Sequence, residues 1–118
     1  MSSPLIVAST DATRQLVMLT VEGSLSDAEQ VESLRLVLPV VPAGHSFILD
    51  LSETTELGQQ AIQALRSVAR DAAGLGVQMI IVCGDLVRRS ELVLADIDSL
   101  VPVVEALEHA LPLTRAAA

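Results

Sequence analysis

Residues 47–51 read Phe-Ile-Leu-Asp-Leu, a nearly continuous apolar run that is typical of a β-strand covered on both faces of its sheet. A second run of this kind, Val-Gln-Met-Ile-Ile-Val-Cys, occupies residues 77–83. Between the two runs, apolar residues recur at helical spacing over residues 59–73, which predicts an amphipathic helix. Buried strands that alternate with a helix predict an α/β fold with right-handed crossovers.

The N-terminal part of the chain predicts an antiparallel hairpin. Residues 5–8 and 16–21 are apolar and rich in β-branched side chains, and a polar turn separates them. Gly23 is expected to end the second of these strands. Ser26 is followed three residues later by Glu29, which is the pattern of a capping box and predicts that a helix starts there.

The C-terminal part of the chain predicts shorter elements. Gly74 is expected to adopt the left-handed conformation that follows the helix at 59–73. Asp85 is a suitable N-cap for a helix that runs to about Leu94. A short extended segment near residues 100–103 and a last helix around residues 105–111 complete the order of elements.

The composition indicates a folded protein and excludes several classes of function. The 118 residues are 51% hydrophobic, which predicts a single domain over residues 1–118 with its core at about 5–111. The chain has one aromatic residue, no Lys and a net charge of −8, which argues against direct binding to nucleic acid. No signal peptide and no membrane-length apolar run is visible, so membrane insertion is not expected and the cytoplasm is the expected location.

No combination of residues in the sequence predicts catalysis, a metal site or a cofactor. Cys83, His45 and His109 are each isolated from other metal ligands in the sequence, and no phosphate-binding glycine motif is present. Asp50 ends a buried strand, where capping of the following turn by its side chain is the favoured interpretation. An enzyme would require a convergent polar pocket that the sequence does not indicate.

The chain resembles the STAS domain of bacterial anti-sigma factor antagonists at four segments, which have the order and spacing of that family: residues 21–26, 48–52, 76–82 and 102–111. The resemblance extends over about residues 16–111. It implies a STAS-type fold: a mixed α/β sheet of about four to six strands with about four helices and an antiparallel hairpin at the N-terminus.

The resemblance implies a non-catalytic regulatory protein that binds an anti-sigma factor, a kinase-like protein that holds a sigma factor inactive. It leaves open whether the chain forms a homodimer. The family carries a phosphorylatable Ser in an Asp-Ser-Ser-Gly-like motif, and the ungapped register places Gly58-Gln59-Gln60-Ala61 at that motif. We therefore expect no phosphorylation at the family position, and Thr55 is the candidate substitute site.

The expected partner-binding face lies where the carboxyl ends of neighbouring strands meet the start of the helix at 59–73. Its predicted residues are Leu25, Thr55, Glu56, Leu57, Gly58, Gln59, Gln60 and Gln63. For Leu57, packing in the core is an equal alternative. The alternative functions are a ligand-sensing STAS domain or an accessory STAS subunit of a transporter.

Overall fold

A computed structural model describes residues 5–26, 28–42 and 44–114. Its strands are β1 (Leu5–Asp11), β2 (Leu16–Leu25), β3 (Ser46–Asp50), β4 (Thr54–Leu57), β5 (Gln78–Val82) and β6 (Val103–Val104). Its α-helices are α1 (Ala28–Arg35), α2 (Gln59–Gly74), α3 (Leu86–Leu94) and α4 (Leu107–Ala110). Two 3-10 helices, η1 (Leu38–Val40) and η2 (Leu111–Leu113), follow α1 and α4.

The six strands form one sheet in the order β1-β2-β3-β5-β6, and β4 pairs with β2 outside this path. β1 and β2 are antiparallel, and the other neighbouring strands are parallel. This arrangement confirms the predicted mixed α/β sheet, its N-terminal hairpin and the two buried strands. The sequence pattern succeeded for β3 and β5 because both strands are covered on both faces and need apolar side chains throughout.

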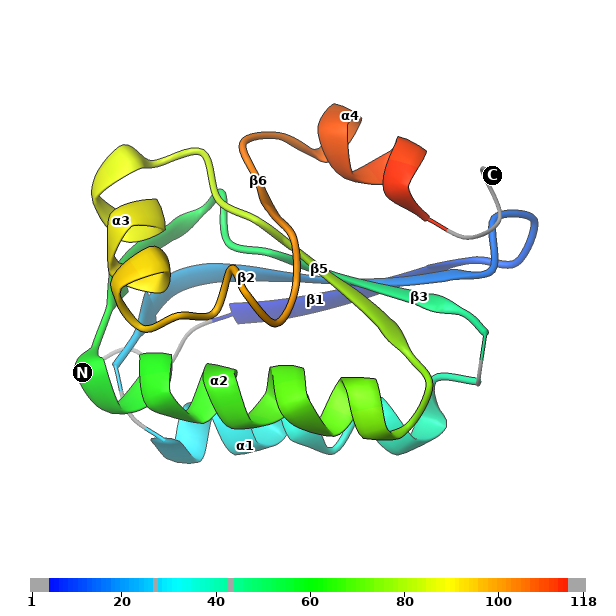
Figure 1. Cartoon of the computed structure of the whole chain (residues 1–118), viewed down its shortest axis with the longest axis horizontal. Coiled ribbons are helices and arrows are strands. Elements are labelled where there is room, and N and C mark those ends of the chain that lie inside the picture. Colours follow the sequence, from blue (N-terminus) through cyan, green and yellow to red (C-terminus); the bar gives the residue numbers. More distant parts are fainter. Residues whose placement is uncertain (1–4, 27, 43, 115–118) are drawn as a thin grey trace.

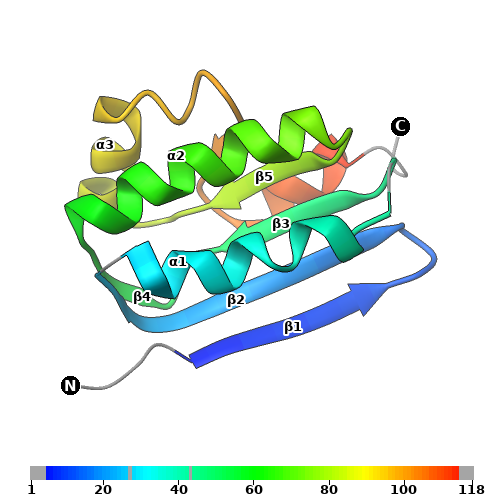
Figure 2. The ribbon, with the colours of Figure 1, turned by 90° about the horizontal axis from the view of Figure 1, so that it is seen from below.

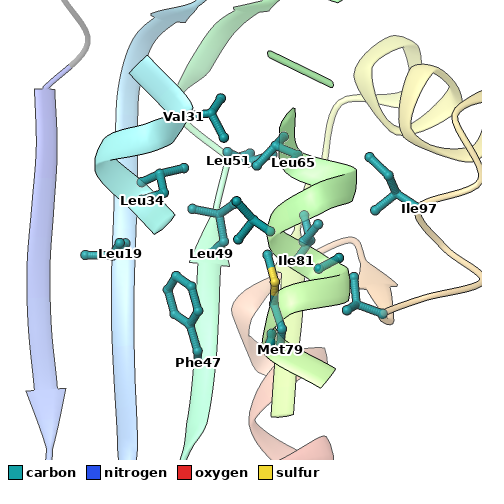
Figure 3. Close-up of a cluster of buried hydrophobic side chains, with 14 of the residues drawn as sticks. Leu19, Val31, Leu34, Phe47, Leu49, Leu51, Leu65, Met79, Ile81 and Ile97 are labelled. Carbon is teal, nitrogen blue, oxygen red and sulfur yellow. The ribbon is translucent and has the colours of Figure 1, made fainter. Parts of the chain in front are cut away.

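Helices cover the two faces of the sheet unequally. α1 and α2 lie along one face, and α4 lies on the other (Figures 1 and 2). Alternate residues of each strand point to opposite faces. Phe47 and Leu49 of β3 therefore join the large core beneath α1 and α2 (Figure 3), whereas Ile48 packs in a smaller cluster with Ala110 of α4.

The second strand does not end at Gly23 as expected. Gly23 has a φ of +101°, and the pairing register shifts between it and Ser24 as β2 continues to Leu25. β3 ends at Asp50 opposite Thr20, so the last part of β2 pairs instead with β4. β4 was not predicted.

The C-terminal end of α2 also differs from the expectation. Gly74 lies in the helix, and Gly76 takes the left-handed conformation with a φ of +72°. The Gly76 and Val77 N–H groups donate to the carbonyls of Ala73 and Ala72, at 3.3 and 3.0 Å. These two bonds form a Schellman motif, and Val77 rather than the exposed Leu75 is the buried residue beyond the helix.

The remaining boundaries follow the sequence closely. Asp85 caps α3 as expected, because its Oδ1 accepts from the Arg88 backbone N–H at 3.0 Å. At the start of α1, the Ser26 N–H donates to Gln30 Oε1 at 2.7 Å. The expected capping partner was Glu29, whose side chain lies outside the described part of the structure. β6 and α4 are shorter than expected and begin a few residues later.

Candidate functional site

The start of α2, strand β4 and the C-terminal end of α3 lie at the same end of the molecule (Figures 1 and 2). This end of the sheet carries the carboxyl ends of the parallel strands, where α/β folds usually bind their ligands. The residues predicted for partner binding lie here, on β2, β4 and the first turns of α2.

Gly58 allows α2 to start close to the end of β2. Its N–H donates to the Leu25 carbonyl oxygen at 2.9 Å, and a Cβ atom at this position would overlap the backbone carbonyl oxygen of Ser26. No side chain larger than hydrogen fits this backbone, so position 58 cannot hold an acidic N-cap residue here. α2 accordingly begins without a side-chain cap.

The structure divides the predicted face into exposed and buried residues. The exposed residues are Thr55, Glu56, Gln59, Gln60 and Gln63, and Gly58 is half-buried. Leu25 is fully buried in the main core, so it presents no side chain to a partner, and that part of the prediction is wrong. Leu25 faces inward because it ends β2 directly opposite Leu57 of β4.

Leu57 packs in the core with 7% exposure, as its alternative interpretation proposed. Its remaining surface lines a groove of about 560 Å³ between α2 and α3. The other lining residues are Gln59, Ile62, Gln63, Arg66, Glu91, Leu94, Ala95 and Asp96. Gln59 and Gln63 on the α2 side of this groove were predicted from the sequence, whereas the residues on the α3 side were not.

Charged groups in the groove are incompletely paired. Arg66 Nη2 lies 4.0 Å from Asp96 Oδ2, which is a weak contact between exposed groups. Arg66 Nε and Glu91 Oε2 are buried and have no hydrogen-bond partner among the described residues. Asp96 has a φ of +65°, an unusual conformation for a residue with a side chain. Unpaired polar atoms and a strained residue therefore lie together in this groove.

Helix α3 exposes several apolar side chains that do not pack in the core. Leu92 is its buried residue, whereas Leu94 is 87% exposed and Val87 is 67% exposed. Positions 87, 91 and 94 fall on one stripe of a helix, so Val87 and Leu94 flank Glu91. The sequence signal was the adjacent pairs Leu86-Val87 and Val93-Leu94, because neighbouring residues of a short helix cannot all face one core.

We call this surface the α2–α3 face. It comprises Thr55, Glu56, Gln59, Gln60, Gln63, Val87 and Leu94, together with the groove. Its exposed apolar side chains lie beside amide groups and partly buried charges. This arrangement is typical of a surface that binds another protein.

Two groups singled out in the sequence, Cys83 and Asp50, lie in surroundings that explain them structurally. Burial raises the pKa of the Cys83 thiol, which disfavours the thiolate form that acts as a nucleophile. The carboxylate of Asp50 accepts hydrogen bonds from the Ser52 N–H and hydroxyl, which confirms it as a turn cap. Among the described residues, no group of three His, Cys, Asp or Glu side chains is placed to hold a metal ion.

The model of the STAS domain family matches residues 7–110. The chain therefore belongs to the STAS domain family. A comparison with curated protein sequences finds no match. None of the described helices is long and apolar enough to cross a membrane.

Solved structures share the fold at low sequence identity. An anti-sigma factor antagonist from Mycobacterium paratuberculosis is 19% identical, with a TM-score of 0.77 over 96% of this chain and 95% of that chain. The anti-sigma factor antagonist SpoIIAA, in its unphosphorylated form, is 13% identical, with a TM-score of 0.63 over 90% and 93% of the two chains. A protein from Shewanella loihica PV-4 with a SpoIIAA-like fold is 16% identical, with a TM-score of 0.58 over 97% and 98%.

Proposed function

We propose that this protein is a non-catalytic regulator that binds a kinase-like anti-sigma factor in the cytoplasm through the α2–α3 face. The observation that carries the proposal is the exposure of Leu94, which lines a groove at the start of α2, and of Val87, which lies on the same stripe of α3. Membership of the STAS family and structural neighbours that are anti-sigma factor antagonists support this partner class.

The physical basis of binding is the surface that a partner would remove from water. Burying an exposed Leu or Val side chain contributes about 1.5–3 kcal/mol each. Glu91 is half-buried at the groove, and a cationic side chain of the partner would be attracted to its carboxylate. The partner segment should therefore present aliphatic side chains next to an Arg or Lys.

Isothermal titration with a kinase-like anti-sigma factor from the same organism tests the proposal. The double variant Val87→Ser/Leu94→Ser should weaken binding by at least about tenfold, because interface anchors dominate binding energy. The matched control is Leu36→Ser/Val40→Ser, since these residues are 77% and 75% exposed but lie outside the α2–α3 face. Equal losses in both variants, or no binding by the wild type, would overturn the proposal.

The charge at the start of α2 provides a second test on the same face. Gln59→Glu and Gln63→Arg each place a charge at the groove without altering a buried residue. We expect both variants to bind the anti-sigma factor more weakly. If both variants bind like the wild type, the partner docks elsewhere on the molecule.

We further propose that partner binding is not switched by phosphorylation at the family position. Residues 58–61 read Gly-Gln-Gln-Ala and carry no hydroxyl, and Gly58 leaves no space for a side chain. Thr55 is exposed on β4 and is the candidate substitute. Incubation with the partner kinase and ATP, followed by intact-protein mass measurement, should leave the mass unchanged. A stoichiometric phosphate on any residue from 52 to 67 would show that the switch has moved to another residue, and would contradict constitutive binding.

A ligand-sensing STAS domain is the second candidate function. The groove volume of about 560 Å³ favours it, because small-molecule pockets have similar volumes. Native mass spectrometry of the protein purified from its own cells would distinguish the two functions. A small molecule that is retained by the wild type and lost from Gln63→Arg would favour ligand sensing.

A further inference from the structure

Strand β1 forms one edge of the sheet, and its outer side has no neighbouring strand among the described residues. It pairs with β2 without interruption from Leu5 to Asp11. Residues 5–10 read Leu-Ile-Val-Ala-Ser-Thr and contain no charge and no Pro. Proteins usually protect such edges with charged residues, Pro, a bulge or a covering element. Asp11 at the end of β1 is its one charged residue, and residues 5–10 have none of these protections.

The opposite edge of the sheet is different. β6 contributes only two residues, so it offers little backbone for pairing. β1 has seven residues and lies outside the area that α1 and α2 cover (Figure 2). Val7 is 47% exposed on one face of β1, and Ala8 is exposed on the other. β1 is therefore the edge with both an accessible backbone and accessible apolar side chains.

We propose that two copies of this chain associate through antiparallel pairing of their β1 strands about a two-fold axis at Ala8. The register follows from the centre of the strand, since residues 5–11 are symmetric about position 8. Ala8 would then lie opposite Ala8 of the second copy, and Val7 opposite Ser9. The two sheets would join into one continuous sheet.

The distribution of charge along β1 favours a second copy as the occupant of the edge. Each chain has a net charge of −8, so two copies repel each other over most of their surface. Along β1 the only charge is Asp11, whose Oδ2 lies 3.8 Å from Arg14 Nε. In the two-fold register Asp11 lies opposite Leu5, so no like charges face each other.

This association would leave the α2–α3 face free. β1 and α3 lie at opposite sides of the molecule (Figure 2). An isologous dimer would therefore carry two separate α2–α3 faces. A partner that is itself dimeric could bind both faces with higher avidity than one face alone provides.

Sedimentation velocity over a range of protein and salt concentrations tests the proposal without any partner. The wild type should shift from monomer to dimer as its concentration rises, and added NaCl should strengthen the dimer by screening the net charge. Ala8→Lys and Ala8→Glu should each raise the dimer dissociation constant by at least about tenfold, because each places like charges opposite one another.

An equimolar mixture of Ala8→Lys and Ala8→Glu should restore the dimer, since opposite charges then face each other across the axis. Ala73→Lys is the matched control, because Ala73 is an exposed Ala on α2, outside the proposed interface. It should dimerise like the wild type. A wild type that stays monomeric, an Ala8→Lys variant that dimerises normally, or a mixture that stays monomeric would each overturn the proposal. Far-UV circular dichroism establishes that every variant is folded.

Discussion

The centre of the sheet and the α2–α3 face differ in the exposure of their apolar side chains and in the pairing of their polar atoms. In β3 and β5, Phe47, Ile48, Leu49, Ile80 and Ile81 are all 0% exposed. At the α2–α3 face, apolar side chains are exposed to solvent, and polar atoms of Arg66 and Glu91 are buried without partners. The centre therefore stabilises the fold, whereas the α2–α3 face leaves apolar surface exposed to water, as the proposed binding of a partner requires.

The largest expected effect tests the centre. Phe47→Ala should lower the free energy of unfolding by about 3–5 kcal/mol, because it removes a fully buried ring and leaves a cavity. Leu94→Ala should change it by less than about 0.5 kcal/mol, since that side chain is exposed. Urea unfolding followed by far-UV circular dichroism suits this chain, which has no Trp or Tyr. If the two variants lost similar free energy of unfolding, the centre of the sheet would not contribute more to stability than the α2–α3 face does.

The next effect concerns the start of α2, where the two regions join. Gly58→Ala should destabilise the protein by about 1–3 kcal/mol, because its Cβ would overlap the Ser26 carbonyl oxygen. Gly74→Ala is the paired control. A Cβ at Gly74 meets nothing within 4 Å and lies in a helix, so stability should rise by about 0.5–1 kcal/mol. Urea unfolding of both variants measures the difference, and a neutral Gly58→Ala would contradict the close contact.

A smaller effect separates stability from binding at the groove. Asp96→Gly should stabilise the protein by up to about 1 kcal/mol, since Gly accepts the φ of +65° without strain. It should also weaken binding of the proposed partner, because it removes a carboxylate from the groove. Gln15→Gly is the control, because Gln15 has a φ of +52° in the β1–β2 turn. It should stabilise the protein and leave partner binding unchanged in titration.

The smallest expected effect is a dependence on pH. Hydrogen bonding from the Arg88 backbone N–H lowers the pKa of Asp85, and a hydrogen bond from Arg89 lowers the pKa of Glu105. A carboxylate with a lowered folded-state pKa stabilises the protein at neutral pH. This contribution is lost as the pH falls through about 4 and below.

Thermal unfolding between neutral pH and pH 3 measures this effect. Asp85→Asn keeps an acceptor for the cap but removes the charge, so its Tm should fall less steeply with acidification than that of the wild type. Asp98→Asn serves as the control, because the exposed Asp98 makes no hydrogen bond or ion pair with the described residues. It should leave the slope unchanged. An unaltered slope in Asp85→Asn would show that the cap charge does not contribute.

The sequence predicts those elements whose local pattern of apolar residues or capping residue indicates a strand or a helix. β3 and β5 were predicted because both of their faces are apolar, and α2 and α3 because of their helical spacing or cap. β4 reads Thr-Thr-Glu-Leu and lacks such a pattern. It becomes a strand through pairing with the end of β2, an interaction between segments that are distant in sequence.

The candidate site was predictable to a similar extent. The exposed start of α2 followed from the order of the elements, and Gln59 and Gln63 lie at the groove as that order implies. The α3 side could not be derived, because local sequence does not determine how α3 packs beside α2. The burial of Leu25 depends in the same way on its pairing with Leu57.

The topology of the sheet also orders the events of folding. The β1–β2 hairpin is its only antiparallel pair and the only one joined by a short turn within the described residues. Hairpins form within about 1–10 μs, whereas parallel pairs wait for the closure of long loops. We therefore expect the outer edge of β1, where residues 5–10 carry no charge, to be exposed during refolding before the core forms. Losses to aggregation should rise with protein concentration, and the Ala8→Lys variant should recover in higher yield than the wild type.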